Sequence, residues 1–357
     1  MDQVCLHSIN DLNELIEEKG WSCILLVIGN HTKNETVFSD LILMLATKNL
    51  IVITTPSGLL DLNDTHSHKH SLNKIEVIIA LGGGKTIDFA KGLIYSNYSA
   101  VDFLYFIAIP TTAGSGSEAT HFAVYYEGCQ KISIQRNNLL PTAVLHHSIF
   151  LKHLSSKQRA TSAFDAIAQC IESIWSRNAT NDSIKLAMEG LNISWKNLTQ
   201  HVIQIDNDID DLMLKAAYMS GKAIAITRTT GPHALSYFLT ANYNIPHGQA
   251  VGLLLPIFFL YNEIMIKKIE VKSIYEVLNN RMQVLFEILN AKDQIECAQL
   301  IQEKMQTVGL AFNFKDHGID ILKTVDDLLL NYNQERFSNH PVPFEYHTLR
   351  QLFLQNG

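Results

Sequence analysis

Two histidines within residues 230–256 offer the clearest chemistry in the sequence. His233 and His247 are each followed by small or apolar residues, and His247 belongs to a PHG turn that precedes a new apolar run. If two predicted helices form an antiparallel hairpin here, both imidazoles can approach one metal ion. The alternative is that each histidine caps a helix or is satisfied inside the core.

A carboxylate and an amide could complete this ligand set. Asp165 and Gln169 are four residues apart, so they lie on one face of a predicted helix. With His233 and His247 they would offer the mixture of oxygen and imidazole ligands that suits a divalent transition metal. An ion with an open coordination position could polarise a carbonyl or an alkoxide. Alone, Asp165 is more typical of a surface or cap position, so the hypothesis depends on the joint occurrence of the residues.

A glycine-rich turn in the N-terminal half could bind a phosphate. The strand-like residues 76–81 lead into Gly82, Gly83, Gly84 and Lys85, and a helical pattern follows. In such a turn, backbone N–H groups approach an anion at the positive end of the helix. The spacing matches neither the GxGxxG fingerprint nor the P-loop, so the motif alone leaves open a βα turn without a ligand.

A second loop follows a second strand-like run. Residues 105–110 read YFIAIP and are followed by TTAGSGSEAT at residues 111–120. These small residues bury little surface, yet they offer many hydroxyls and amides. We expect this loop to form another wall of a polar ligand site at the carboxyl edge of the sheet.

The elements that position these motifs alternate between strands and helices. Buried strands are predicted at residues 23–28, 50–54, 76–81 and 105–110, with a helix at 8–20 before the first strand and another at 38–45 between the first two. This alternation is typical of βαβ units and predicts an α/β domain with a parallel sheet. Residues 121–126 and 131–135 alternate as a β-hairpin.

Helical patterns replace strands after residues 144–148. We expect helices at 160–175, 183–202, 209–226, 231–243 and 249–264, and we divide the chain into domains 1–148 and 149–357. Residues 61–70 are predicted to form a surface loop. Its His66, His68 and His70 could bind a metal adventitiously, but a flexible loop lacks a pre-formed geometry.

Composition excludes several classes of protein. The chain has 357 residues, 47% hydrophobic and 18% charged, with a net charge of −7, which argues against nucleic acid as a main partner. Its five cysteines are scattered and form no CxxC pair, as in proteins of a reduced compartment. We find no signal peptide, and the apolar run 251–261 is short and interrupted by Pro256, so we expect a cytoplasmic protein without a membrane span.

Four motifs resemble those of the iron-containing alcohol dehydrogenase family in order and approximate spacing. They are ALGGGKTIDFAKG, IAIPTTAGSGSEAT, FDAIAQCIES and PHALSYFLTANYNIPHGQAVGLLLP, and the resemblance extends from about residue 22 to the closing segment RFSNHPVPFEYHTLRQLF. The resemblance implies an α/β dinucleotide-binding domain, 1–148, that faces an all-α metal-binding domain, 149–357, across a cleft. It also implies hydride exchange between a nicotinamide, NADH or NADPH, and an aldehyde or alcohol.

The resemblance also implies roles for individual residues. The cofactor pyrophosphate would lie on Gly83, Gly84 and Lys85, the cofactor wall would include Asp88, Thr111, Thr112, Ser115 and Thr120, and Lys131 would lie near the nicotinamide ribose. Asp165, His233, His247 and Gln169 would hold the divalent metal, Fe²⁺ or Zn²⁺. A homodimer is expected, both from the family and because dimers are the commonest soluble assemblies.

The chain departs from the family pattern at three places. Gln169 stands where histidine is usual, and an amide oxygen binds a metal less strongly than imidazole does. Tyr237 stands where the family often has a second histidine in the proton path, so Tyr237 or water would supply the proton at a catalytic centre that includes His247. Gly29, followed by Asn30, His31 and Lys33, replaces an acidic residue that would repel a 2′-phosphate, so we expect NADPH to be accepted.

A subgroup of the family that reduces phosphonoacetaldehyde is similar to this chain at the same places. The similar segments are ATHFAVYY, DAxxQxIES and PHALSY, and they imply a small anionic aldehyde as substrate. His121, Lys222 and Arg228 could bind its phosphonate, although an exposed surface charge explains each equally well. Two other classes stay open: a lyase, because the fold also resembles that of dehydroquinate synthases, and a nucleotide-binding protein that has lost its metal site.

Overall fold

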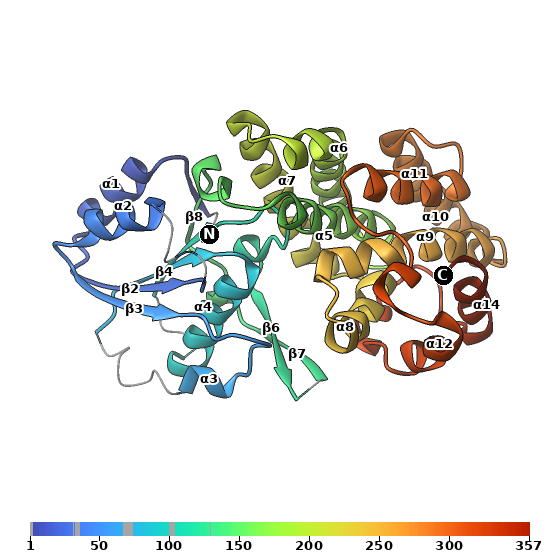
Figure 1. Cartoon of the computed structure of the whole chain (residues 1–357), viewed down its shortest axis with the longest axis horizontal. Coiled ribbons are helices and arrows are strands. Elements are labelled where there is room, and N and C mark those ends of the chain that lie inside the picture. The colour runs from blue at the N-terminus through green and yellow to red at the C-terminus, as the bar shows by residue number, and fades with distance from the viewer. Residues whose placement is uncertain (1–2, 31, 33–35, 67–73, 100–103, 129) are drawn as a thin grey trace.

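A parallel sheet forms the N-terminal half of the protein, drawn in blue and cyan in Figure 1. The computed structural model describes residues 3–30, 32, 36–66, 74–99, 104–128 and 130–357. The strands of the sheet are β1 (Val4–Leu6), β2 (Cys23–Ile28), β3 (Asn49–Thr54), β4 (Val77–Gly82), β5 (Tyr105–Pro110) and β8 (Ala143–Leu145). Their order is β1-β8-β5-β4-β2-β3, and every neighbouring pair is parallel. The predicted parallel α/β fold is confirmed.

The central strands of the sheet are buried, and the edge strands are more exposed to solvent. All residues of β4 are buried, because helices cover both faces. Strand β3 was expected to be buried as well, but this prediction is wrong: only Ile53 of β3 is buried, because β3 lies at the edge and pairs with β2 alone. The sequence patterns missed β1, whose three residues pair with β8 at the opposite edge.

Three helices cover the two faces of the sheet. Leu12 of α1 (Ile9–Lys19) and Leu41 of α2 (Thr36–Leu45) share a hydrophobic cluster with Leu26, whereas α4 (Gly84–Asn97) packs on the opposite face, with Leu25. The predicted start and end of α1 are confirmed. Ser8 and Asp11 form a capping box, and Gly20 ends the helix in the left-handed region at a φ of 67°.

One short helix interrupts the predicted surface loop. Residues Asn63–His66 form the helical turn α3 instead of a loop, because Thr65 is buried and its hydroxyl is hydrogen-bonded to Ser96 Oγ of α4, 2.6 Å away. His68 and His70 lie outside the described residues, as does the side chain of His66. The predicted β-hairpin is confirmed as β6 (Phe122–Glu127) and β7 (Gln130–Gln135).

Helices make up the C-terminal half, drawn from green to red in Figure 1. The helices are α5 (Ser156–Trp175), α6 (Asn181–Ile203), α7 (Asn207–Thr227), α8 (Gly231–Tyr243), α9 (His247–Ile266), α10 (Lys272–Leu289), α11 (Gln294–Thr307), α12 (Ile321–Leu330), α13 (Gln334–Phe337) and α14 (Tyr346–Asn356). Each helix that the sequence predicted is present, with ends that differ by a few residues at most. Helix α5 starts earlier than expected because Ser155 and Gln158 form a capping box.

Helix α9 is the central helix of this half. Pro256 lies inside α9, as the helix predicted over residues 249–264 requires, and tertiary packing on nearly all sides outweighs the hydrogen bond that proline cannot donate. By length and composition, α9 is also long and apolar enough to cross a membrane. However, 83% of its most apolar window is buried inside the protein, as in the core helix of a globular domain.

Candidate active site

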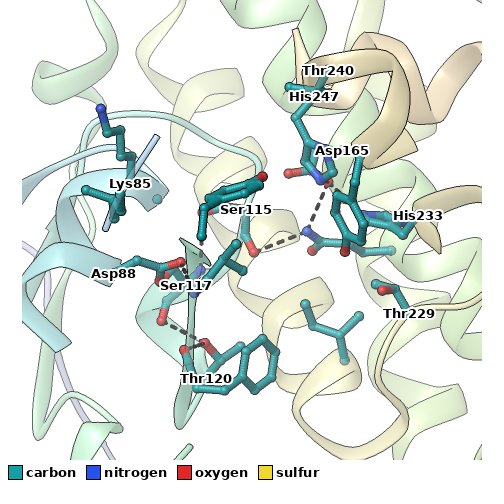
Figure 2. A pocket seen from close by; sticks show the side chains of 18 of the residues that line it. Lys85, Asp88, Ser115, Ser117, Thr120, Asp165, Thr229, His233, Thr240 and His247 are labelled. Carbon is teal, nitrogen blue, oxygen red and sulfur yellow. Dashed lines mark hydrogen bonds and ion pairs between the residues drawn. The ribbon is translucent and has the colours of Figure 1, made fainter. Parts of the chain in front are cut away.

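A pocket between the two halves brings the predicted motifs together. Figure 2 shows Lys85 and Asp88 of the sheet half on one side, and Asp165, His233 and His247 of the helical half on the other. Residues that line the pocket include Gly84, Lys85, Asp88, Ser115, Ser117, Thr120, Phe122, Asp165, Gln169, His233, Tyr237, His247 and Arg336. A second pocket along the same sheet edge is lined by Gly29, Gly83, Thr111 and Thr112, and shares Lys85 with the first.

The glycine-rich turn forms the start of helix α4. Gly83 is its N-cap and provides no side chain to cap the first turn. A Cβ atom on Gly84 would lie 2.3 Å from Ser115 Oγ, so the turn and the loop at residues 111–120 meet only because this residue is glycine. The Lys85 amine donates a hydrogen bond to Pro56 O, 2.6 Å away, and bridges to the loop after β3. The geometry is that of an anion site at a helix start.

Asp88 links the elements that wall this end of the pocket. Its carboxylate accepts hydrogen bonds from the Ser117 hydroxyl and, at 2.9 Å, from Val124 N. Lys91, one helical turn further along α4, is completely buried. Burial lowers the pKa of Lys91 to about 8, although the nearby carboxylates oppose this effect.

The sequence analysis did not identify Lys91 as part of the site. Its amine donates to Ser117 O at 2.6 Å, to Thr120 Oγ1 at 2.8 Å and to Phe122 O at 2.8 Å. Thr120, which was predicted to wall the cofactor site, is therefore fixed by the buried Lys91 amine. The segment IDFAKG at residues 87–92 carried a signal, since a lysine interrupts the apolar face of a helix three residues after Asp88.

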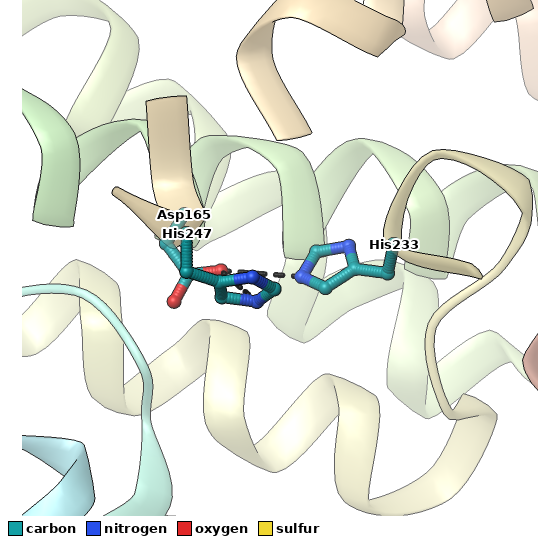
Figure 3. A group of neighbouring side chains, drawn as sticks. All are labelled: Asp165, His233 and His247. Carbon is teal, nitrogen blue, oxygen red and sulfur yellow. Dashed lines mark hydrogen bonds and ion pairs between the residues drawn. The ribbon is translucent and has the colours of Figure 1, made fainter. Parts of the chain in front are cut away.

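Asp165, His233 and His247 converge on one point (Figure 3). Their ligand atoms all lie within 4.8 Å of one another, with His233 Nε2 3.2 Å and His247 Nε2 3.9 Å from Asp165 Oδ1. Asp165 lies in the middle of α5, while the histidines come from the first turns of α8 and α9. A Cβ atom on Gly248 would lie 1.9 Å from Thr161 O, so glycine allows α9 to start directly against α5.

Glu172 is a functional candidate that the sequence analysis missed. It lies two turns after Asp165 on α5, is fully buried, and pairs through Oε2 with Nδ1 of His233. Its Oε1 accepts hydrogen bonds from Thr230 N at 2.7 Å and from Thr230 Oγ1 at 2.9 Å. A carboxylate behind a histidine fixes the ring so that the other nitrogen can bind a metal. The spacing from Asp165 could have indicated a shared helix face, but not the partner.

The charges in this cluster suit a cation. Burial alone would lower the pKa of His233, but the Glu172 carboxylate and the hydrogen bonds to Asp165 and Glu172 raise it to about 9. Two buried carboxylates therefore stabilise positive charge at this point. The donor set of one carboxylate and two imidazoles fits a divalent ion such as Fe²⁺ or Zn²⁺.

Gln169 lies beside the cluster as a hydrogen-bond donor. Its Nε2 donates to Asp165 Oδ1 at 3.1 Å and to Ser115 O at 3.2 Å, while its Oε1 accepts from Ser220 Oγ at 2.8 Å. In this arrangement the amide oxygen is bonded to Ser220 and the amide nitrogen positions Asp165. A role of Gln169 as fourth metal ligand stays a prediction.

Tyr237 packs directly on a predicted metal ligand. Its ring stacks on that of His247, with centroids 5.6 Å apart and an angle of 9° between the planes. Burial raises the pKa of Tyr237 well above its ordinary value, although the charge of Arg336 opposes this shift. The hydroxyl is therefore protonated at neutral pH and can act as a donor.

None of the three predicted phosphonate partners lines the pocket directly, although Arg228 contacts the ring of the lining residue Phe122. Among the described residues that line the pocket, His121, Lys222 and Arg228 are absent, and the one arginine is Arg336, which the sequence analysis did not consider. Lys222 is exposed and lies over the Tyr218 ring. The side chain of Lys131 lies outside the described residues, as do His31 and Lys33.

The parallel α/β half and the all-α half meet at the pocket that is lined by both the glycine-rich turn and the cluster of Asp165, His233 and His247. Family models named "Iron-containing alcohol dehydrogenase" and "Fe-containing alcohol dehydrogenase family, C-terminal" match residues 5–148 and 159–353, respectively. The chain belongs to the iron-containing alcohol dehydrogenase family. The resemblance found in the sequence is thereby confirmed.

Individual relatives of known activity also match this chain, each over part of its length. The chain is 30% identical over 216 residues to phosphonoacetaldehyde reductase of Streptomyces viridochromogenes, a match that covers 53% of this chain and 54% of the relative. It is 31% identical over 191 residues to 4-hydroxybutyrate dehydrogenase of Clostridium kluyveri, covering 48% and 51%. The matches thus span about half the length of these relatives.

Solved structures share the fold across the whole chain. The sulfoacetaldehyde reductase from Bifidobacterium kashiwanohense, solved in complex with NAD⁺, has a TM-score of 0.85 at 22% identity, covering 99% of this chain and 96% of that one. The alcohol dehydrogenase from Oenococcus oeni has a TM-score of 0.88 at 19% identity, covering 100% and 99%. At these identities the similarity shows the fold alone.

Proposed function

We propose that this protein is a metal-dependent NAD(P)H aldehyde reductase that converts phosphonoacetaldehyde to 2-hydroxyethylphosphonate. The observation that carries the proposal is that a single pocket is lined by the glycine-rich turn at Gly84 and by the cluster of Asp165, His233 and His247. A nicotinamide bound along the sheet edge would face a substrate carbonyl held at the cluster. A pocket with both a hydride source and an electrophilic centre suits carbonyl reduction.

The residues of the chain would divide the chemistry between them. When bound, the nicotinamide supplies the hydride and the divalent ion at Asp165, His233 and His247 supplies Lewis acidity toward the carbonyl oxygen. Glu172 orients His233, and Gln169 orients Asp165. One proton completes the alcohol, and water or the protonated hydroxyl of Tyr237 would donate it.

The choice of substrate is supported by relatives that act on aldehydes with an acidic group. Phosphonoacetaldehyde reductase and 4-hydroxybutyrate dehydrogenase are named for such compounds or their alcohols. For the cofactor, Gly29 lines the second pocket without a carboxylate, which supports acceptance of NADPH as well as NADH. We also propose that the enzyme is cytoplasmic and that it forms a homodimer. Light scattering coupled to gel filtration would test the homodimer.

Oxidation of NADPH and NADH against a panel of aldehydes tests the proposal. The panel contains phosphonoacetaldehyde, propanal, glycolaldehyde and succinic semialdehyde, each with and without added Fe²⁺ or Zn²⁺. We expect the highest kcat/KM with phosphonoacetaldehyde and a loss of activity after treatment with a chelator. Activity on neutral aldehydes only would reject the phosphonate substrate and keep the dehydrogenase.

The same assay separates the alternatives that the sequence left open. A lyase of the dehydroquinate synthase type would show no net oxidation of NADPH with any aldehyde. A nucleotide-binding protein without a metal site would bind NADPH, contain no metal on elemental analysis and stay inactive after Fe²⁺ or Zn²⁺ is added back.

A further inference from the structure

A buried arginine lines the pocket, and no described residue forms a hydrogen bond with its charged group. Arg336 is 3% exposed and belongs to the short helix α13. Its backbone N donates to Asn333 Oδ1 at 2.8 Å, but within the described parts of the chain its guanidinium makes no hydrogen bond and no ion pair. Buried arginine is almost always paired, because removing an unpaired charge from water is costly. The guanidinium of Arg336 thus borders the pocket without a carboxylate partner among the residues that the structure describes.

A second guanidinium lies close to the first. The ring of Phe122, another residue of the pocket wall, is contacted by Arg228 at 3.9 Å and by Arg336 at 5.5 Å from its centroid. Nη2 of Arg228 donates to the Gln135 side chain, whereas Nη1 is buried without a hydrogen-bond partner among the described residues. Two arginines are therefore held together around one aromatic ring.

Local electrostatics and backbone geometry indicate that the position of Arg228 is energetically costly. Burial, and then the like charge of Arg336, lowers the pKa of Arg228 to about 10. Arg228 also has a φ of 60° and a ψ of 176°, a region that side chains other than glycine rarely adopt. Strain of this kind is retained where the surroundings hold a residue in place for a function.

The carboxylates near this pair do not neutralise Arg336. Asp88 and Asp165 line the same pocket, but Asp88 is bonded to Ser117 and Val124, and Asp165 to His233 and Gln169. Glu335 is exposed, and its charge acts on Arg228. The excess of positive charge at this end of the pocket is available to a ligand.

We propose that Arg336 binds the acidic group of the substrate, an oxyanion such as phosphonate, sulfonate or carboxylate, and that Arg228 reinforces it from behind Phe122. The planar guanidinium matches two oxygens of such a group. Tyr237 lies between this subsite and the predicted metal ligands. The charge of Arg336 acts on its hydroxyl, and its ring stacks on that of His247. A substrate held by its acid at Arg336 would direct its carbonyl toward the cluster. This inference rests on the proposed aldehyde reduction.

The matched variants Arg336→Gln and Lys222→Gln test this subsite. The readout is the ratio of kcat/KM for phosphonoacetaldehyde to kcat/KM for propanal, which cancels general damage to the enzyme. We expect Arg336→Gln to lower this ratio about 100-fold, the scale of a lost charge-assisted hydrogen-bond pair. Lys222→Gln, which removes an exposed positive charge outside the pocket, should leave the ratio unchanged. Arg336→Lys should give an intermediate ratio, because it keeps the charge and loses the planar fork.

Inhibition of the wild-type enzyme provides a test that needs no variant to fold. Methylphosphonate, methanesulfonate and acetate should each compete with propanal and not with NADPH, and their order of inhibition identifies the preferred oxyanion. Propanal reduction that none of them inhibits, or an unchanged ratio in Arg336→Gln, would overturn the subsite and leave the aldehyde reductase standing. A protein that reduces no aldehyde, charged or neutral, would overturn both.

Discussion

Glu172 binds Nδ1 of His233 and thereby leaves Nε2 of His233 directed at Asp165 Oδ1, 3.2 Å away. Glu172, His233 and Asp165 thus form a chain of contacts that runs from the fully buried part of α5 to the pocket. Because the imidazole is fixed from behind, the ligand atom of His233 is ready for a metal before the metal arrives.

Replacing Glu172 by Gln should weaken metal binding. The amide keeps the shape of the side chain but loses the charge that orients and polarises His233, so we expect affinity for Zn²⁺ or Fe²⁺ to fall about 10- to 100-fold. Titration of the metal-free protein with a competing chelator measures this. Glu189→Gln, which removes an exposed carboxylate paired with Lys215, is the control. Equal affinities in the two variants would show that Glu172 has only a structural role.

Replacing His247 by Ala should abolish turnover without preventing cofactor binding. His247 lies at the cluster, whereas the glycine-rich turn belongs to the other half of the protein. We expect a loss of at least about 100-fold in kcat, the scale of removing an electrostatic group from an active site, with an unchanged Kd for NADPH. Stopped-flow absorbance and fluorescence titration measure the two quantities, with the exposed His347→Ala as the control. An active His247→Ala enzyme would refute the metal-centred mechanism.

Replacing Gly84 by Ala should weaken cofactor binding. The added Cβ would lie 2.3 Å from Ser115 Oγ and 2.7 Å from Ser115 Cβ, so the turn and the loop must separate. Overpacking of this size typically costs about 1–3 kcal/mol, which corresponds to a Kd for NADPH about 10- to 100-fold higher. The double variant Gly84→Ala with Ser115→Gly removes the obstacle and should recover part of the affinity. A double variant as weak as the single one would place the cause elsewhere.

Acidification should destabilise the protein through His340. Burial, followed by the charge of Arg177, lowers the pKa of His340 from 6.5 to about 3 in the folded state. The unfolded chain therefore takes up a proton first as the pH falls below 6.5, and stability is lost progressively from there toward pH 3. At pH 5 this contribution is about 2 kcal/mol relative to pH 7.5.

Urea unfolding at pH 7.5 and pH 5 tests the role of His340. The free energy of unfolding should fall by about 2 kcal/mol more in the wild type than in His340→Gln, which cannot be protonated in this range. Other titrating groups are common to both proteins and cancel in the comparison. The same pH dependence in the two proteins would contradict the assignment.

Much of the fold could be predicted because buried strands and helix caps have local signatures. Strand β5 coincides with an uninterrupted apolar run, and α1 is bounded by the capping residues Ser8 and Gly20. Strand β1 has three residues, too few for a periodic pattern, and its place is set by pairing with β8 at the far end of the domain. The edge position of β3 likewise depends on partners that a local pattern does not reveal.

The same distinction applies to the site. Asp165, His233 and His247 could be proposed from their types and motifs, and the structure brings them together. Glu172 and Arg336 could not, because their importance comes from what surrounds them. Glu172 meets a histidine 61 residues away, and Arg336 reaches the pocket from the short helix α13.

The buried Lys91 amine can report chemically on the loop that is predicted to wall the cofactor site. Because all of its donors are occupied by the loop that carries Ser117 and Thr120, an amine-reactive reagent can reach Lys91 only when that loop lifts from α4. The rate of Lys91 acylation, followed by mass spectrometry, would therefore measure how often this loop opens, and we expect a bound dinucleotide to slow it.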